Sequence, residues 1–249
     1  MLIPAILTQV SSGRIFLTAE WRNLVLLNYE VDACLLVPFV PAGTEIDSWN
    51  ARVYVSLVGF QFLKTRVFGF PIPLHSNFDE VNLRFYVRRH EGNEVRRGVV
   101  FIREIVPRRA IALVARTFYN ENYVALPMAH DIRATDHDGI AAAYRWQHRR
   151  NWSEMRFESQ GNPEPLLDGS EEQFIAEHYW GYAAQSDGSC VEYQVTHPSW
   201  RVWQARHAEF NGNVEELYGR EFAAVLSREP DSAFLAEGSA VTVMRGRRL

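Results

Sequence analysis

Alternating apolar and polar residues run through much of the chain and predict a protein built mainly of β-strands. Every second residue of the stretch 80–88 is apolar: Val81, Leu83, Phe85 and Val87. A period of two is the pattern of a strand whose two faces meet different surroundings. Residues 52–63 are instead apolar almost throughout, as expected of a strand that is covered on both faces.

Turn sequences divide the chain into further strands. Glu91-Gly92-Asn93 can reverse the chain into a hairpin with a strand at residues 98–106. Asp-Gly dipeptides at 138–139 and 187–188 are typical of turns, and each precedes a strand-like stretch. The remaining predicted strands are residues 110–119, 140–148, 189–196 and 239–244.

Helices are predicted at three places. Ser170 and Gln173 form a capping-box pattern, which indicates a helix start. The residues that follow share one face at helical spacing: Phe174, Ile175, His178, Tyr179 and Tyr182. A second helix is predicted over residues 214–226, although Gly219 disfavours a helix there. A short helical turn at residues 32–37 is predicted to end at Pro38.

These elements predict one domain. The sequence has no internal repeat, and the loops at residues 71–77 and 160–169 are too short for linkers. At 249 residues the chain can bury a sizeable core without disulfides. We therefore predict a single α+β domain over residues 1–249, with mostly antiparallel strands.

Charge and composition exclude several classes of partner. The net charge is -4 and the isoelectric point is near 6.1, so we expect neither a nucleic-acid nor a membrane partner. Residues 1–12 lack the basic start of a signal peptide, and Cys34 and Cys190 are compatible with free thiols. We expect a cytoplasmic protein.

Motifs for common cofactors are absent. The sequence has no glycine-rich nucleotide loop, no His-Glu-x-x-His, no Cys-x-x-Cys and no Gly-x-Ser-x-Gly elbow. His130-Asp131 and Asp136-His137-Asp138 are metal-type ligands, but their spacing matches no specific site and favours turns. No cofactor and no metal are therefore expected.

A row of polar side chains on one predicted strand is the strongest candidate site. Glu80, Asn82, Arg84 and Tyr86 project to one side of residues 80–88, about 7 Å apart from one to the next. On a concave surface they could bind a polar ligand, with Arg84 holding a carboxylate through two hydrogen bonds. The alternative is the solvated outer face of an antiparallel sheet.

Four further residues are candidates with a structural alternative. Arg116, after an apolar strand segment, is either a paired structural arginine or a ligand anchor. His197 has a side chain suited to acid–base chemistry, although a lone histidine at a strand end is often structural. Tyr123, with Met128 and Phe118, fits either the core or a pocket wall. Lys64, the single lysine of the chain, fits an ordinary surface position.

Several of these segments together resemble a known family. They include residues 54–60 (Tyr-Val-Ser-Leu-Val-Gly-Phe), Gly69-Phe70-Pro71, the Asn-Leu-Arg-x-Tyr-Val core at 82–87, and His-Pro-x-Trp at 197–200. Over about residues 20–244 the chain resembles the YqjF-like family, a bacterial domain of unknown function in the acetoacetate-decarboxylase-like superfamily.

The resemblance implies a cone-shaped antiparallel β-barrel with flanking helices and an internal cavity, which would turn the polar row inward. The decarboxylase relatives use a lysine pair to form a Schiff base. The corresponding stretch here, residues 117–126, contains no lysine, Lys64 does not align with the pair, and arginine is a poor nucleophile. The resemblance therefore implies a related fold without that chemistry.

Three functional hypotheses follow. The first is a cavity that binds a small polar or carboxylate-bearing molecule through Glu80, Asn82, Arg84 and Arg116, with Tyr86 and Tyr123 as further contacts. The second is an enzyme, of lyase or hydrolase type, that uses Glu80 or His197 as a proton carrier. The third is a structural or interaction protein, because aromatic residues make up 13% of the chain. A homodimer is compatible with all three.

Overall fold

Antiparallel strands make up most of the molecule in a computed structural model that describes residues 14–73, 75–108, 122–136 and 138–249. The first half of the chain forms β1 (Ile15–Val31), β2 (Glu45–Ile46), β3 (Val53–Val67), β4 (Phe70–Pro71), β5 (Phe78–Glu91), β6 (Glu94–Val106), β7 (Tyr123–Ala125) and β8 (Met128–Ala134). The second half forms β9 (Ile140–His148), β10 (Asn151–Ser159), β11 (Glu164–Pro165), β12 (Trp180–Ala184), β13 (Cys190–Thr196), β14 (Arg201–Asn211), β15 (Ser232–Met244) and β16 (Arg247–Arg248).

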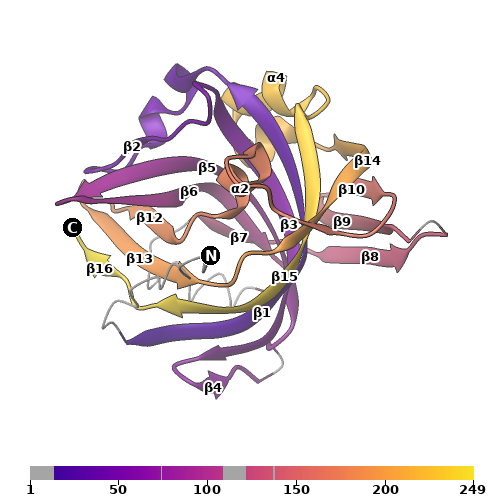
Figure 1. Ribbon diagram of the computed structural model, residues 1–249, viewed down its shortest axis with the longest axis horizontal. Helices are drawn as coiled ribbons and strands as arrows, with labels where there is room; N and C mark the ends of the chain where they lie inside the picture. Colours follow the sequence, from indigo (N-terminus) through magenta and orange to yellow (C-terminus); the bar gives the residue numbers. More distant parts are fainter. Residues whose placement is uncertain (1–13, 74, 109–121, 137) are drawn as a thin grey trace, which may run out of the picture.

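The long strands pair into a closed ring. In order around it, hydrogen bonds join β6, β5, β3, β1, β15, β13 and β12, and β12 pairs again with β6 (Figure 1). The contact between β12 and β6 is parallel and brings Gly98 opposite Trp180. A Cβ atom on Gly98 would lie 2.7 Å from the Trp180 carbonyl oxygen, so this close approach requires glycine.

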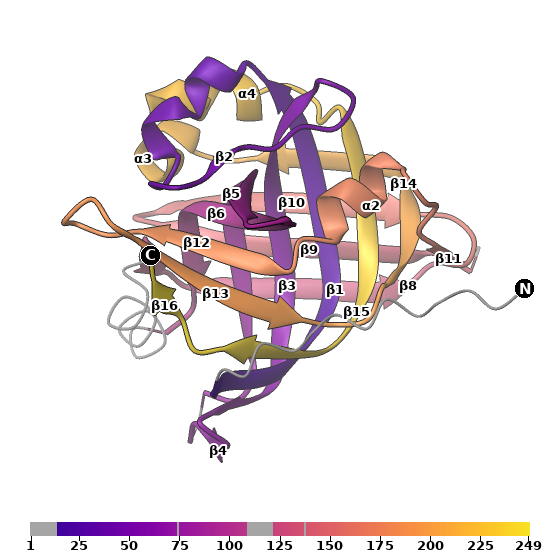
Figure 2. The same cartoon turned by 60° about the vertical axis from the view of Figure 1, so that its left-hand side comes forward.

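A second layer covers one side of the ring. Strands β8, β9, β10 and β14 form this layer, and β14 joins it to the ring by pairing with β15. Figure 2 shows β8, β9 and β10 running behind β1 and β3 and across their direction. Tyr144, Trp146 and Met155 of this layer are fully buried against the ring strands, which forms the larger hydrophobic core.

Strand β5 is buried on both of its faces. Val81, Leu83 and Phe85 face the core between the two layers and have no exposed surface. The alternate residues Glu80 and Asn82 point into the ring and are only 3% and 1% exposed. The polar face of this strand is therefore an interior face, not a solvated one.

The strand predictions agree with the structure where the local pattern is strong. The alternating stretch lies in β5, and the two-residue turn at Gly92-Asn93 joins it to β6. β9 has the predicted bounds, whereas the predicted strand at 239–244 is only the end of β15. β1, β10 and β14 were not predicted. The predicted strand at 110–119 lies outside the described residues.

The helix predictions need three corrections. α2 (Glu171–Ala176) begins as predicted, since Ser170 Oγ accepts a hydrogen bond from the Gln173 amide at 3.1 Å. It ends before His178, and Tyr182 lies in β12, because the chain there pairs with β13 and β6.

The other two predicted helices are each divided into shorter segments. Gly219, with φ of 97°, separates α3 (Val214–Tyr218) from the 3₁₀ turn Arg220–Phe222 and α4 (Ala223–Leu226). Pro38 lies inside the 3₁₀ turn Val37–Phe39, near its start, where no backbone N–H is needed; another turn spans Ala33–Leu35. No helix in the described ranges is long and apolar enough to cross a membrane.

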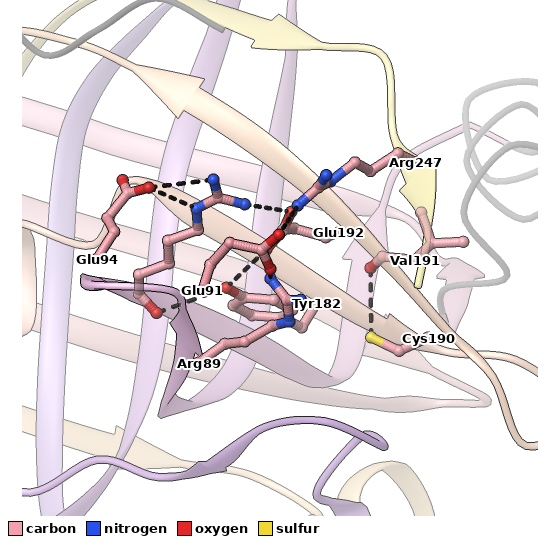
Figure 3. Close-up of polar contacts among 9 residues, drawn as sticks. Arg89, Glu91, Glu94, Tyr182, Cys190, Val191, Glu192 and Arg247 are labelled. Atoms are coloured by element: carbon pink, nitrogen blue, oxygen red, sulfur yellow. Dashed lines mark hydrogen bonds and ion pairs between the residues drawn. The ribbon is translucent and has the colours of Figure 1, made fainter.

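Ion pairs around the buried carboxylate of Glu192 stabilise the ring near the C-terminal end of the chain. Glu192 of β13 is 1% exposed and lies within 3.3 Å of Arg89 and Arg96 and within 2.8 Å of Arg247 (Figure 3). Tyr182 donates a further hydrogen bond to this carboxylate at 3.1 Å. One carboxylate thus connects β5, β6, β12 and β16 to β13.

Candidate functional site

A cavity of about 140 Å³ lies against the inner face of the ring. Strands β1, β3, β5, β6 and β13 contribute side chains to its wall. Ala176 at the end of α2, His178 after the helix and Trp180 at the start of β12 also line it. Among the described residues the polar or charged lining residues are Thr65, Glu80, Asn82, Arg84, Glu104, Tyr123, His178, Tyr193 and His197. The remaining wall is apolar and rich in aromatic rings.

The polar row of β5 forms one side of the cavity. Glu80, Asn82 and Arg84 all line it, and alternation along the strand places them in one line. Asn82 Nδ2 donates a hydrogen bond to Glu80 Oε1 at 3.1 Å. Tyr123 donates its phenolic hydrogen to Glu80 Oε2 at 3.3 Å, which orients this carboxylate from a second strand.

Arg84 is held at the end of the cavity near α2. Its Nη2 donates to the Ile175 carbonyl oxygen at 3.3 Å, and its guanidinium carbon lies 5.7 Å from the centre of the Tyr86 ring. Within the described part of the chain, its Nε and the Oδ1 of Asn82 are buried and have no hydrogen-bond partner. A buried donor and a buried acceptor are therefore unsatisfied within the described residues.

Two of the predicted contacts stand apart from this group. Tyr86 is not among the residues that line the cavity, because its hydroxyl lies 2.6 Å from Ser56 Oγ within the wall. Arg116 lies outside the described residues. Tyr123 lines the cavity, is 8% exposed and also belongs to a hydrophobic core cluster, so it combines both alternatives.

Glu104 is a lining residue that the sequence did not single out. It is 1% exposed and lies opposite Asn82 on β6. Continuing the pairing of Arg84 with Phe101 would place Arg103 opposite Asn82. A bulge between Leu83 and Arg84 shifts the register by one residue and brings Glu104 inward. The only sequence signal was the charged pair Arg103-Glu104 between Ile102 and Ile105 in a predicted strand.

His178 and Asp47 form a second buried pair beside the cavity. His178 Nε2 lies 3.9 Å from Asp47 Oδ2, and Arg97 Nε lies 3.1 Å from the same oxygen. Burial lowers the pKa of His178, although the neighbouring Asp47 opposes this effect. His178 is therefore neutral near pH 7, and a neutral imidazole can accept or donate a hydrogen bond.

His197 lines the cavity from the end of β13 but is not joined to the polar row by a hydrogen bond within the described ranges. Its ring stacks on Trp200 at 4.0 Å, and its Nδ1 lies 2.9 Å from the Pro198 carbonyl oxygen. Burial lowers the pKa of His197 to about 4. The ring is thus a neutral group packed among aromatic rings.

Lys64 and His130 are not among the residues that line the cavity. The Lys64 side chain is 76% exposed, and its Nζ lies 2.6 Å from Glu20 Oε1. His130 Nδ1 lies 2.8 Å from Asp79 Oδ2, and His137 lies outside the described residues. Within the described ranges, no three His, Cys, Asp or Glu side chains are placed to hold a metal ion.

Comparison with known proteins identifies a family and a fold. The model of DUF2071, described as an uncharacterized conserved protein, matches residues 18–240. The uncharacterized protein YqjF of Bacillus subtilis is 28% identical over 155 residues, which are 62% of this chain. The chain is aligned with only 60% of the length of that relative.

The similar solved structures share the fold at low identity. Acetoacetate decarboxylase from Legionella pneumophila superposes with a TM-score of 0.66 at 12% identity, covering 100% of this chain and 92% of the other. The enduracididine biosynthesis enzyme MppR, in a complex with pyruvate, gives 0.63 at 12% identity over 97% and 93% of the two chains.

Proposed function

The chain belongs to the DUF2071 family and has an acetoacetate decarboxylase-like fold, and we propose that its cavity binds a small organic molecule with a carboxylate group. The observation that carries the proposal is the buried row Glu80, Asn82 and Arg84 along an otherwise apolar cavity. Such a wall with a few converging polar groups is typical of small-molecule sites. The closed pairing of strands supports the cone-shaped barrel that the family resemblance implies.

Arg84 is the residue suited to the carboxylate. A guanidinium can donate two parallel hydrogen bonds to one carboxylate, and Arg84 Nε has no partner among the described residues. Asn82 Oδ1 is equally unpaired and accepts hydrogen bonds, so it suits a hydroxyl on the same ligand. Leaving both groups buried without partners costs stability, which a ligand can recover.

The names of the structural neighbours support a small acid. One is an acetoacetate decarboxylase, and another was solved with pyruvate. Acetoacetate and pyruvate each carry a carboxylate on a short chain.

We propose that the ligand is bound without a lysine Schiff base. Lys64 is the single lysine of the chain, and its amine is largely exposed and paired with Glu20. An exposed amine in an ion pair lacks the desolvation or the neighbouring cation that activates a nucleophilic lysine. Borohydride added in the presence of pyruvate or acetoacetate should therefore leave the mass of Lys64-containing peptides unchanged.

Calorimetric titration of Arg84 variants tests the carboxylate site. The probes are pyruvate, acetoacetate and phenylacetate, each compared with its uncharged amide. We expect each acid that binds to lose at least about tenfold in affinity with Arg84→Gln, because a charge-assisted pair is lost. Arg66→Gln is the matched control, since Arg66 is exposed and lies outside the cavity wall. Equal binding of acids and amides would contradict the proposal.

A second candidate function is acid–base catalysis on the bound molecule, with Glu80 as the proton carrier. Asn82 and Tyr123 hold both carboxylate oxygens of Glu80 at the cavity wall, which is the fixed geometry that proton transfer needs. Glu80→Gln should then abolish turnover of an acid while its binding is retained. His197 is the alternative carrier, and loss of turnover with His197→Phe alone would assign the role to it.

A further inference from the structure

One end of the cavity is built almost entirely from aromatic rings. Phe62 stacks on Phe78 at 4.7 Å, and Phe60 lies 5.1 Å from Phe62. Trp21 contacts Phe60 and Phe62 edge to face, at 5.4 and 5.7 Å. All four residues line the cavity. We call this group, Trp21, Phe60, Phe62 and Phe78, the aromatic box.

The box and the carboxylate site lie at opposite ends of one row. Phe78, Glu80, Asn82 and Arg84 are alternate residues of β5, so the row runs from the box to Arg84. The pairing of Phe62 with Phe78 and of Phe60 with Glu80 places the other rings beside the start of the row. The cavity therefore changes from apolar to polar along the strand.

The volume of the whole cavity, of which the box is one end, limits the size of the ligand. An apolar cavity of about 150 Å³ holds one benzene molecule. The cavity here, at about 140 Å³, has a similar size. A two-carbon or three-carbon acid would bind Arg84 but leave the box empty, whereas two fused rings would not fit without movement of the wall.

From these features we infer that the ligand is a carboxylic acid with one aromatic ring on a short arm, the carboxylate at Arg84 and the ring in the aromatic box. This inference rests on the proposed function and adds the class of its ligand. Edge-to-face and offset contacts with four rings favour an aromatic ring over an aliphatic chain of equal size.

Two polar atoms in the same wall define what the ring carries. Trp21 Nε1 and Thr65 Oγ1 are buried and have no hydrogen-bond partner in the described part of the chain. Trp21 is part of the box, and Thr65 also lines the cavity. A hydroxyl group on the ring would satisfy one of them, so a hydroxylated ring binds at least as tightly as an unsubstituted one.

Titration calorimetry with matched acids tests the ligand class. We expect phenylpyruvate to bind at least tenfold more tightly than pyruvate, and phenylacetate more tightly than 4-methylpentanoate. Phe62→Leu and Phe60→Leu should each reduce the difference between phenylpyruvate and pyruvate at least threefold. Phe70→Leu should leave it unchanged, because Phe70 is 76% exposed and outside the cavity.

Each failure has a different meaning. Equal binding of pyruvate and phenylpyruvate would overturn the aromatic ligand and leave the carboxylate site in place. If neither acid binds, or if phenylacetamide binds as tightly as phenylacetate, the proposed function itself is wrong. 4-Hydroxyphenylacetate could instead bind less tightly than phenylacetate. If Thr65→Val then left that difference in affinity unchanged, the assigned orientation of the ring would be wrong.

Discussion

At the scale of single residues, the cavity is lined by histidines that are neutral under physiological conditions. Burial lowers the pKa of both His178 and His197, and for His197 the value falls to about 4 from an ordinary 6.5. The folded protein therefore resists protonation at these positions, whereas the unfolded chain does not. This difference makes the stability depend on pH.

Acid should destabilise the protein partly through His197. Between pH 6.5 and 4 the unfolded chain binds a proton that the folded chain does not, so stability is full above pH 6.5 and falls as the pH approaches 4. The loss is at most roughly 3 kcal/mol for this pKa difference. His197→Phe keeps a ring to stack on Trp200 and should flatten the decline, as urea denaturation at pH 7 and pH 5 would measure. His207→Phe, at an exposed position, is the control. Parallel declines in all three proteins would refute this role of His197.

At the scale of elements, α2 links a local sequence signal to the site. The helix buries Phe174, Ile175 and Ala176 against the ring, and the Ile175 carbonyl oxygen accepts a hydrogen bond from Arg84. Its first turn depends on the Ser170 cap. The helix that Ser170 caps thus supplies a hydrogen-bond acceptor to the guanidinium that we assign to the carboxylate.

Ser170→Ala should lower the free energy of unfolding by about 1 kcal/mol, since an amide at the helix start loses its partner. Ser170→Thr keeps the hydroxyl and should restore most of that loss. Chemical denaturation of the three proteins measures both effects. A Ser170→Thr protein as unstable as Ser170→Ala would show that the hydroxyl does not act as the cap.

Local sequence patterns predicted the strands that carry the polar row, but not all the buried polar residues near it. The alternation in β5 and the two-residue turn to β6 are visible in the sequence because they depend on neighbouring residues. Glu104 was missed because a bulge changes the register of β6 by one residue. Asp47 was missed because the two-residue strand β2 brings it inward only through pairing with β5.

At the scale of the whole molecule, the ring depends on contacts between distant segments. β12 returns to β6 about 80 residues later in the chain, and the sequence alone has no local signal for this parallel pairing. The expectation of a ring came from the family resemblance instead. Glu192 stabilises the same region by joining three arginines from β5, β6 and β16.

Glu192→Gln should therefore destabilise the protein by about 3 kcal/mol or more, because removing one partner leaves buried charges uncompensated. Glu94→Gln is a matched control, since Glu94 pairs with Arg96 but its side chain is 58% exposed; its cost should stay within about 1 kcal/mol. Thermal and urea unfolding would compare the two. Similar small losses in both variants would show that the arginines find other partners.

Burial of β5 on both faces has a consequence for protein engineering. Cavity-facing positions 80, 82 and 84 alternate with core positions 81, 83 and 85 along one strand. A combinatorial library restricted to the even positions can therefore vary recognition while the packing between the two layers is kept.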